Sequence, residues 1–152
     1  MAALEIKGIE AIVDDEDLEI LRAFPWQRVK AKKVYFQARI NGQLVYLHRL
    51  LTNATKGLEV DHINGNTLDN RKSNLRLCTS KENRRNQALR RDNLAGLKGV
   101  SMDKRRMVLK FTARIKTDSG TIYLGGYKTP EEAHAAYCEA SKKYHGDFGR
   151  TS

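Results

Sequence analysis

Cysteine is scarce in this chain, which has two in 152 residues, Cys78 and Cys138. They lie far apart and no Cys-x-x-Cys pair occurs, so neither a zinc ribbon nor a disulfide framework is expected. Long apolar runs are also missing, both at the start and in later segments, which argues against secretion and membrane spanning. We therefore expect a cytoplasmic protein without a membrane partner.

Acidic residues are in the minority, because 18 Asp and Glu face 28 Lys and Arg, for a net charge of +10. Residues 93–152 are the most basic part, with 11 cations and 6 acids. This balance favours a polyanionic partner, nucleic acid before an anionic membrane surface. A basic protein without such a partner is the alternative. The length and the 40% hydrophobic content suit one medium globular domain or two small ones.

The stretch from Gly57 to Asn83 organises the chain. Val60 and then residues 75–77 alternate apolar with polar, as half-buried strands do, and the loop between them is rich in Asn, Asp and Gly, which favour turns. Thr79 and Glu82 have the spacing of a helix capping box. The pattern predicts strand, long loop, strand and helix, which would bring together four polar side chains: Asp61, His62, Asn74 and Asn83.

The residues before this stretch predict a small α+β unit with an antiparallel meander. The acidic run Asp14–Asp17 should form the N-terminal end of a helix that Pro25 ends, and Asn41-Gly42 should form a tight turn. His48 opens a short helix that ends near Gly57; it is either an accessory to the site, binding phosphate or metal, or a structural histidine. Strands are expected at residues 9–13, 26–29, 34–40 and 44–47.

The residues after this stretch predict a basic helix from Asn83 to Arg91, a linker at residues 92–96 and a second unit. Its helix should begin at Thr129-Pro130, with a capping box, and stop at Gly146. Its strands are expected at residues 99–102, 108–116 and 121–125.

Alternation along the second unit's strands separates two faces of its sheet. Phe111, Ala113 and Ile115 should face the helix, with polar side chains on the outer face. Such a face fits strand-based reading of a DNA groove, and an ordinary solvated sheet face is the alternative. The candidate DNA contacts of the sheet and its first turn are Lys104, Arg105, Arg106, Lys110, Thr112, Arg114, Lys116 and Tyr123.

The central stretch resembles the HNH endonucleases, in the phage and homing-endonuclease branch that lacks zinc-binding cysteines. The resemblance covers about residues 44–90, within a first domain of residues 1–92. It rests on motifs in the family's order: His48-Arg49-Leu50, Val60 to Asn66, Leu68 to Arg71, Asn74-Leu75-Arg76, Thr79, Asn83 and Asn86.

Residues 93–152 resemble an AP2 DNA-binding domain, although Phe111 stands where that family often has Trp. The motifs are Lys98-Gly99-Val100, Ala113-Arg114-Ile115, Tyr123 to Tyr127, Thr129 to Ala133, Ala136-Tyr137, Ala140 and Gly146. Together the resemblances imply an α+β protein, with a ββα-metal nuclease core followed by a three-stranded antiparallel sheet and one helix.

The HNH resemblance also implies roles for the clustered side chains. His62 would be the general base, and Asn74 would hold the loop and orient His62. Asp61 and Asn83 would bind one divalent metal, Mg²⁺ or Mn²⁺, which prefer oxygen ligands. Further phosphate contacts are expected from three arginines: Arg76, Arg84 and Arg85.

These observations favour a DNA endonuclease, active as a nickase if monomeric, or as a homodimer, in a bacterial or phage-infected cell. Its partner would be double-stranded DNA. One alternative is a non-catalytic transcription regulator with a decayed nuclease fold, against which the intact Asp61, His62, Asn74 and Asn83 argue. The other is a basic RNA-binding or structural protein.

Overall fold

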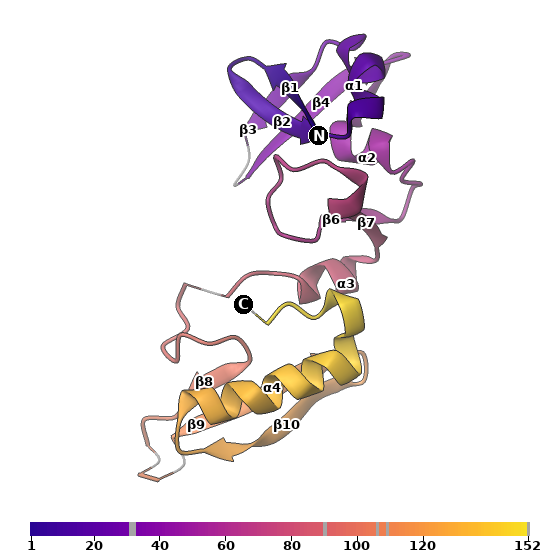
Figure 1. Cartoon of the computed structure of the whole chain (residues 1–152). Coiled ribbons are helices and arrows are strands. Elements are labelled where there is room, and N and C mark those ends of the chain that lie inside the picture. Colours follow the sequence, from indigo (N-terminus) through magenta and orange to yellow (C-terminus); the bar gives the residue numbers. More distant parts are fainter. Residues whose placement is uncertain (31–32, 90, 106, 109, 152) are drawn as a thin grey trace. The chain divides into compact units, whose positions relative to one another are not determined.

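A computed structural model describes residues 1–30, 33–89, 91–105, 107–108 and 110–151. The chain divides into two compact units, Met1–Asn83 and Arg84–Ser152, and most of their helices and strands are labelled in Figure 1. The division lies on the N-terminal side of the linker that the sequence predicts at residues 92–96. No described helix has both the length and the apolar character needed to cross a membrane.

The first unit begins with an antiparallel hairpin, which the sequence predicts only in part. Its second strand was predicted, and its first strand was missed because Glu5 and Lys7 interrupt a short apolar run. Lys7 and Gly8 form the turn with positive φ angles of 49° and 78°. The elements up to the meander are β1 (Ala2–Ile6), β2 (Ile9–Val13), α1 (Asp15–Arg22), β3 (Gln27–Lys30), β4 (Val34–Ile40) and β5 (Gln43–Tyr46).

These elements enclose the apolar core of the first unit. Leu21 of α1, Phe36 of β4 and Leu47 are each at most 1% exposed. β4 pairs with both β3 and β5, and the Asn41-Gly42 turn joins β4 to β5 with positive φ at both residues, as predicted. The core gives the polar residues that follow a rigid support.

The central stretch folds as two short strands and a helix, as predicted. It contains α2 (Leu47–Leu51), β6 (Glu59–His62), a 3₁₀ turn (Lys72–Asn74), β7 (Leu75–Cys78) and α3 (Ser80–Arg85). The strands are antiparallel, with Asp61 opposite Arg76 and His62 opposite Leu75.

Two predicted helix ends in this region are wrong. α2 ends at Leu51, well before Gly57, and the Arg49 guanidinium instead binds the carbonyls of the connecting loop, including that of Leu58 at 2.8 Å. α3 ends at Arg85 and not at Arg91. The Lys98 ammonium donates to the carbonyls of Arg85 and Gln87, at 2.8 and 2.6 Å, which satisfies groups that a longer helix would use internally.

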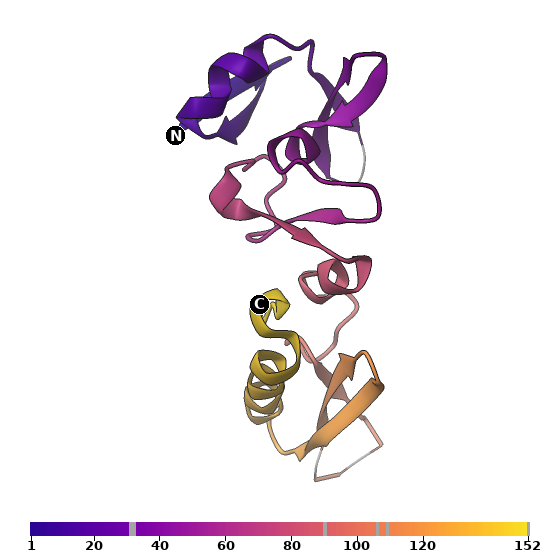
Figure 2. The same ribbon diagram turned by 90° about the vertical axis from the view of Figure 1, so that its right-hand side faces the viewer.

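The second unit is a three-stranded antiparallel sheet with a helix against one face (Figure 2). The helix starts with the predicted capping box, because Thr129 and Glu132 each accept the other's backbone N–H. Gly99 lies under the Tyr137 ring, where an added Cβ would be 2.0 Å from the ring, so only glycine fits. The elements are β8 (Val100–Met102), β9 (Phe111–Thr117), β10 (Gly120–Tyr127), α4 (Pro130–His145) and a 3₁₀ turn (Gly146–Phe148).

Candidate nuclease site

Asp61 is a buried carboxylate whose charge is balanced across the hairpin. It is 6% exposed, and its Oδ2 accepts from Nε and Nη2 of Arg76 at 2.9 and 2.7 Å. The antiparallel register produces the pair, because residues directly opposite each other point to the same face. Arg76 was expected to contact phosphate. In this structure its guanidinium pairs with Asp61, and a contact with phosphate stays a prediction.

His62 ends β6 and is 5% exposed. Its Nε2 lies 3.3 Å from Oδ1 of Asn70, and its ring centre is 5.5 Å from that of His48 and 6.4 Å from that of Tyr35. Burial lowers the pKa of His62, against the opposing effects of Asn70 and Asp61. The imidazole is therefore neutral at neutral pH, as a proton acceptor must be.

His48 completes a group of rings beside His62. It lies in the first turn of α2, and its ring centre is 5.5 Å from those of both Tyr35 and Tyr46. Burial, followed by the neighbouring His62, lowers the pKa of His48 to about 4. The structure thus places the proposed accessory residue next to the proposed base, as a neutral ring that excludes water from one side.

Asn74 stabilises the loop between β6 and β7 through hydrogen bonds of its side chain and its backbone. Its Oδ1 accepts from the backbone N–H of Asn64 at 3.0 Å, and its Nδ2 donates to the Asp69 carbonyl at 2.7 Å. Its own carbonyl accepts from the N–H of Ile63 at 2.9 Å. These bonds fit the loop-holding role predicted for Asn74. The amide opposite Nε2 of His62 belongs to a different residue, Asn70.

Asn83 is held next to β6 by Glu59. Nδ2 of Asn83 donates to Oε2 of Glu59 at 2.6 Å, and the capping box of Thr79 and Glu82 fixes the start of the helix that carries Asn83. Glu59 and Asp61 are two residues apart on β6 and so share a face of the strand. Glu59, Asp61 and Asn83 therefore offer oxygen atoms to one side of the hairpin.

Cys78 lies on the partner strand, opposite Glu59, and is 2% exposed. Its Sγ donates to the Glu59 carbonyl at 3.6 Å. Burial first, and then the nearby carboxylates of Asp61 and Glu59, raise the pKa of Cys78 to about 11. The thiol is thus inert at neutral pH and gives the site neither a nucleophile nor a thiolate ligand.

The donor set at this hairpin suits a hard divalent cation. Among the described residues, no group of three or more His, Cys, Asp or Glu side chains is arranged to hold a metal ion. The expected site instead combines one carboxylate, Asp61, with one amide oxygen, that of Asn83. Mg²⁺ is commonly bound by a few protein oxygens and retained waters, so these residues fit it.

Two residues of the site escaped the sequence analysis. Asn70 was read as a turn residue, and Glu59 was not singled out. The alternation of β6 could have placed Glu59 on the same face as Asp61. The contact between Asn70 and His62 depends on the path of a long loop, for which the sequence carries no comparable signal.

The outer face of the second unit's sheet carries exposed cations around an aromatic ring. The Arg114 guanidinium lies 5.9 Å from the centre of the Tyr123 ring, its cross-strand neighbour, and Tyr123 is 53% exposed. Lys104, Lys110 and Lys116 are exposed. The name basic face is used here for Arg114, Lys116 and Tyr123 of this surface, together with Lys104 and Lys110 of the loop between β8 and β9.

The other predicted DNA contacts do not belong to the basic face. Thr112 is 6% exposed, and its hydroxyl donates to the Ser101 carbonyl at 3.3 Å, so the expected exposure of its side chain to DNA is corrected. Arg85 forms an ion pair with Asp118 at 2.9 Å, and the exposed Arg105 pairs with Asp103 at 3.2 Å. Arg84 is exposed. Arg106 lies outside the described residues.

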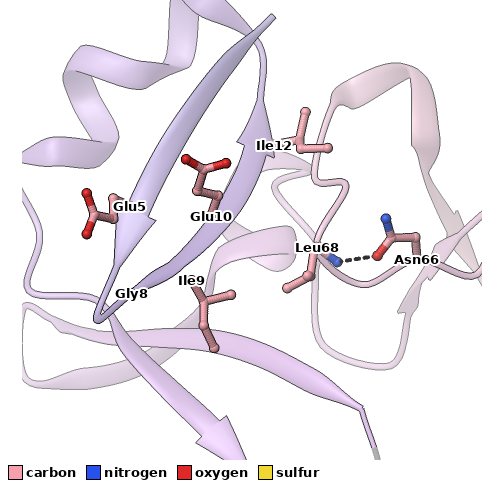
Figure 3. A pocket seen from close by; sticks show the side chains of 7 residues that line it. All are labelled: Glu5, Gly8, Ile9, Glu10, Ile12, Asn66 and Leu68. Carbon is pink, nitrogen blue, oxygen red and sulfur yellow. Dashed lines mark hydrogen bonds between the residues drawn. The ribbon is translucent and has the colours of Figure 1, made fainter.

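An open pocket of about 710 Å³ lies elsewhere in the first unit, beside the β1–β2 hairpin (Figure 3). Two carboxylates, Glu5 and Glu10, stand opposite each other at its wall. Two acids directly across a strand pair repel each other and would also repel a phosphate backbone. This open, acidic pocket therefore differs chemically from the buried polar site at β6 and β7.

The segment that contains these residues matches known proteins. Residues 45–85 match the family model described as HNH endonuclease. The chain is 35% identical over 95 residues to "Protein 3.8" of Escherichia phage T7, an alignment that covers 62% of this chain and 76% of that protein. No solved structure matches the chain. The predicted HNH resemblance is confirmed, and the chain belongs to the family of phage T7 protein 3.8, with an HNH endonuclease domain at residues 45–85.

Proposed function

We propose that this protein is a metal-dependent DNA endonuclease that hydrolyses phosphodiester bonds, including by nicking one strand. Membership of a nuclease family supports hydrolysis of DNA. One observation carries the proposal. The β6–β7 hairpin and α3 carry the buried Asp61 and His62 and the side chain of Asn83, and each of these three side chains has a hydrogen-bond partner that holds it.

His62 is the general base in this proposal. A water molecule must lose a proton as it attacks phosphorus, and a neutral imidazole accepts that proton at neutral pH. Burial keeps His62 neutral, and the His48 and Tyr35 rings shield it from bulk solvent. His48 is thus an accessory that maintains the base in its unprotonated form.

Asp61 and Asn83 are the residues that would hold one divalent metal, Mg²⁺ or Mn²⁺. HNH nucleases generally use such an ion, and when bound it supplies positive charge to the scissile phosphate and to the leaving oxygen. The Arg76 guanidinium pairs with Asp61 and aligns it within the buried hairpin. Glu59 orients Asn83 by accepting its amide N–H, and Asn74 keeps the intervening loop folded.

The second unit is the DNA-targeting part of the proposal, as an AP2-like domain. The exposed cations of the basic face would bind backbone phosphates, and Tyr123 would pack against sugar or base. Arg84 adds an exposed cation at the end of α3. The support is the three-stranded sheet with α4 on one face and basic side chains on the other.

The test is the conversion of supercoiled plasmid to open circles by the purified full chain, with Mg²⁺ and with EDTA. We expect nicking that requires the metal, and a loss of about 10²-fold to 10⁴-fold in His62→Ala, because a positioned general base contributes that much. The variant should still retard duplex DNA in a gel. Cleavage by His62→Ala at the wild-type rate, with contaminating nuclease excluded, would contradict the assignment, and binding without cleavage by the wild type would favour a DNA-binding regulator.

A further inference from the structure

Asn70 lies against His62 with its side chain fixed at both ends. It is 2% exposed. Its Nδ2 donates to the Thr67 carbonyl at 3.2 Å, so Oδ1 is the atom turned toward Nε2 of His62 at 3.3 Å. Reversing the amide would set its oxygen against the Thr67 carbonyl oxygen, two acceptors with no proton between them. The bond to Thr67 therefore determines the orientation of Asn70.

An acceptor at this position decides which ring nitrogen of His62 carries the proton. An amide oxygen accepts and cannot donate, so a neutral imidazole bonded to it must carry its proton on Nε2. The lone pair then belongs to Nδ1. Asn70 thus selects one of two otherwise similar tautomers, and it selects the one in which Nδ1 can take a proton from water.

The backbone of Asn70 is held from outside the HNH match. Its N–H donates to the Ile12 carbonyl of β2 at 2.7 Å, and the Ile12 N–H donates to the Leu68 carbonyl at 2.8 Å. Figure 3 shows the side chains of Ile12 and Leu68 at this contact. Just beyond it, Oδ2 of Asp14 accepts from the N–H of Lys72 at 2.8 Å. β2 therefore pairs with residues 68–70 along its free edge.

We propose that Asn70 is a positioning residue that sets the tautomer of His62, and that β2 is the support that holds Asn70 in place. The proposal rests on the proposed role of His62 as general base. It gives the N-terminal hairpin, which precedes the matched residues 45–85, a part in the reaction without contact to substrate.

A merely structural Asn70 would behave differently. Its loss would then lower stability and leave the tautomer of His62 unchanged. A neighbouring residue of the same type provides the matched control, because Asn66 is exposed and its Oδ1 accepts from the N–H of Leu68 at 3.1 Å, away from the imidazole. Asn66→Ala loosens the same loop but removes no contact with His62.

The experiment is ¹⁵N NMR of the His62 ring in the full-length chain without metal, at about pH 8.5, where an imidazole is neutral. Chemical shifts of the two ring nitrogens separate the protonated from the unprotonated one. We expect Nε2 to carry the proton in the wild type and in Asn66→Ala. In Asn70→Ala we expect a mixture of tautomers and a 10-fold to 100-fold loss of nicking rate, part of what a positioned base contributes.

Protonation of Nδ1 in the wild type would overturn the proposal even if no variant folds. An Asn70→Ala protein with the wild-type tautomer would also overturn it. Because this readout needs neither DNA nor metal, it separates failure of the positioning role from failure of the nuclease assignment. A wild type with Nε2 protonated but without nicking would refute the proposed function alone.

The support from β2 is tested by Ile12→Pro, with Ile12→Val as control. The backbone groups of Ile12 point to residues 68 and 70, so proline removes the bond to Leu68 and spares the hydrogen bonds between β1 and β2. We expect mixed tautomers of His62 in Ile12→Pro and the wild-type state in Ile12→Val. A wild-type tautomer in a folded Ile12→Pro protein would remove the bond between Ile12 and Leu68 from the proposal, because proline keeps the carbonyl that Asn70 binds.

Discussion

The polar residues at β6–β7 and those of the basic face differ in their burial and in how firmly their side chains are held. Asp61, His62 and Asn74 are each at most 7% exposed and each has a protein partner within hydrogen-bond distance. Lys116 and Tyr123, in contrast, are exposed to solvent. The first set is positioned during folding, before any substrate arrives. The second lies at the surface, where it is open to a partner such as the phosphate backbone proposed above.

This difference has an energetic consequence. Removing one partner of a buried polar pair leaves a charge or a hydrogen-bonding group without compensation, which is costly for each residue. An exposed cation contributes little by itself, and several act together through the release of counterions from DNA. Substitutions at the site should therefore act singly and on folding, whereas those on the basic face should act cumulatively and on binding.

The largest effect is expected from Asp61→Ala, which leaves the Arg76 guanidinium in the hairpin without its carboxylate. The side chains of the pair are 7% and 15% exposed. We expect the variant to lose about 3 kcal/mol of unfolding free energy, as for other broken buried pairs, and to lose cleavage. Urea unfolding followed by circular dichroism measures the first effect.

The control is the double variant Asp61→Ala with Arg76→Met, which removes both charges and should recover much of the stability without recovering cleavage. An unchanged urea midpoint in Asp61→Ala alone would show that the pair is not buried in solution, and the comparison with the basic face would fail.

A smaller effect is expected from acid, through His48. Its pKa falls from 6.5 to about 4 on folding because of burial. Between these values the unfolded chain binds a proton that the folded chain excludes, so stability is complete above about pH 6.5 and falls as the pH is lowered toward 4. We expect His48 to account for a loss on the order of 2 kcal/mol, given its partial exposure.

Unfolding free energies of the wild type and of His48→Gln between pH 4 and 7.5 measure this contribution as the difference between the two curves. The same acid-induced loss in both proteins would show that His48 is already accessible to protons in the folded state. Lys116→Gln, on the basic face, should leave the wild-type curve unchanged over this range.

The smallest effect for each residue is expected on the basic face. Arg114→Ala and Lys116→Ala should each weaken binding of duplex DNA a few-fold and lower the slope of log K against log salt by about 0.9, one phosphate contact each. Fluorescence anisotropy at several salt concentrations measures both. Thr112→Val, at a buried position two residues before Arg114 on β9, is the matched control. An unchanged salt slope in the double variant would place the DNA contact elsewhere.

Much of the fold could be predicted because its signals are local. The alternation in β6 and β7, and the capping boxes at Thr79 and Thr129, depend on residues at most a few positions apart. The end of α3 could not be predicted, since the basic run offers no stop signal, and the carbonyl of Arg85 is bound by Lys98 from beyond the helix.

The candidate residues of the site could be named from the sequence, whereas their contacts could be predicted less well. The family motif named Asp61, His62, Asn74 and Asn83, and the hairpin brings Asp61 and His62 together. Which partner each one has depends on register and loop path. One residue of register places Arg76 against Asp61 instead of toward solvent, and the β2 edge sets the position of Asn70. Residue type alone contains neither fact.

The buried thiol of Cys78 makes the site observable without any substrate. It bonds to the carbonyl of Glu59, on the strand that carries Asp61, and its high pKa leaves it almost fully protonated at neutral pH. A thiol reagent can reach it only when β6 and β7 separate. In a Cys138→Ser background, the rate at which Cys78 is modified would measure how often the hairpin opens. The chain therefore contains a built-in probe for the lifetime of the assembled site.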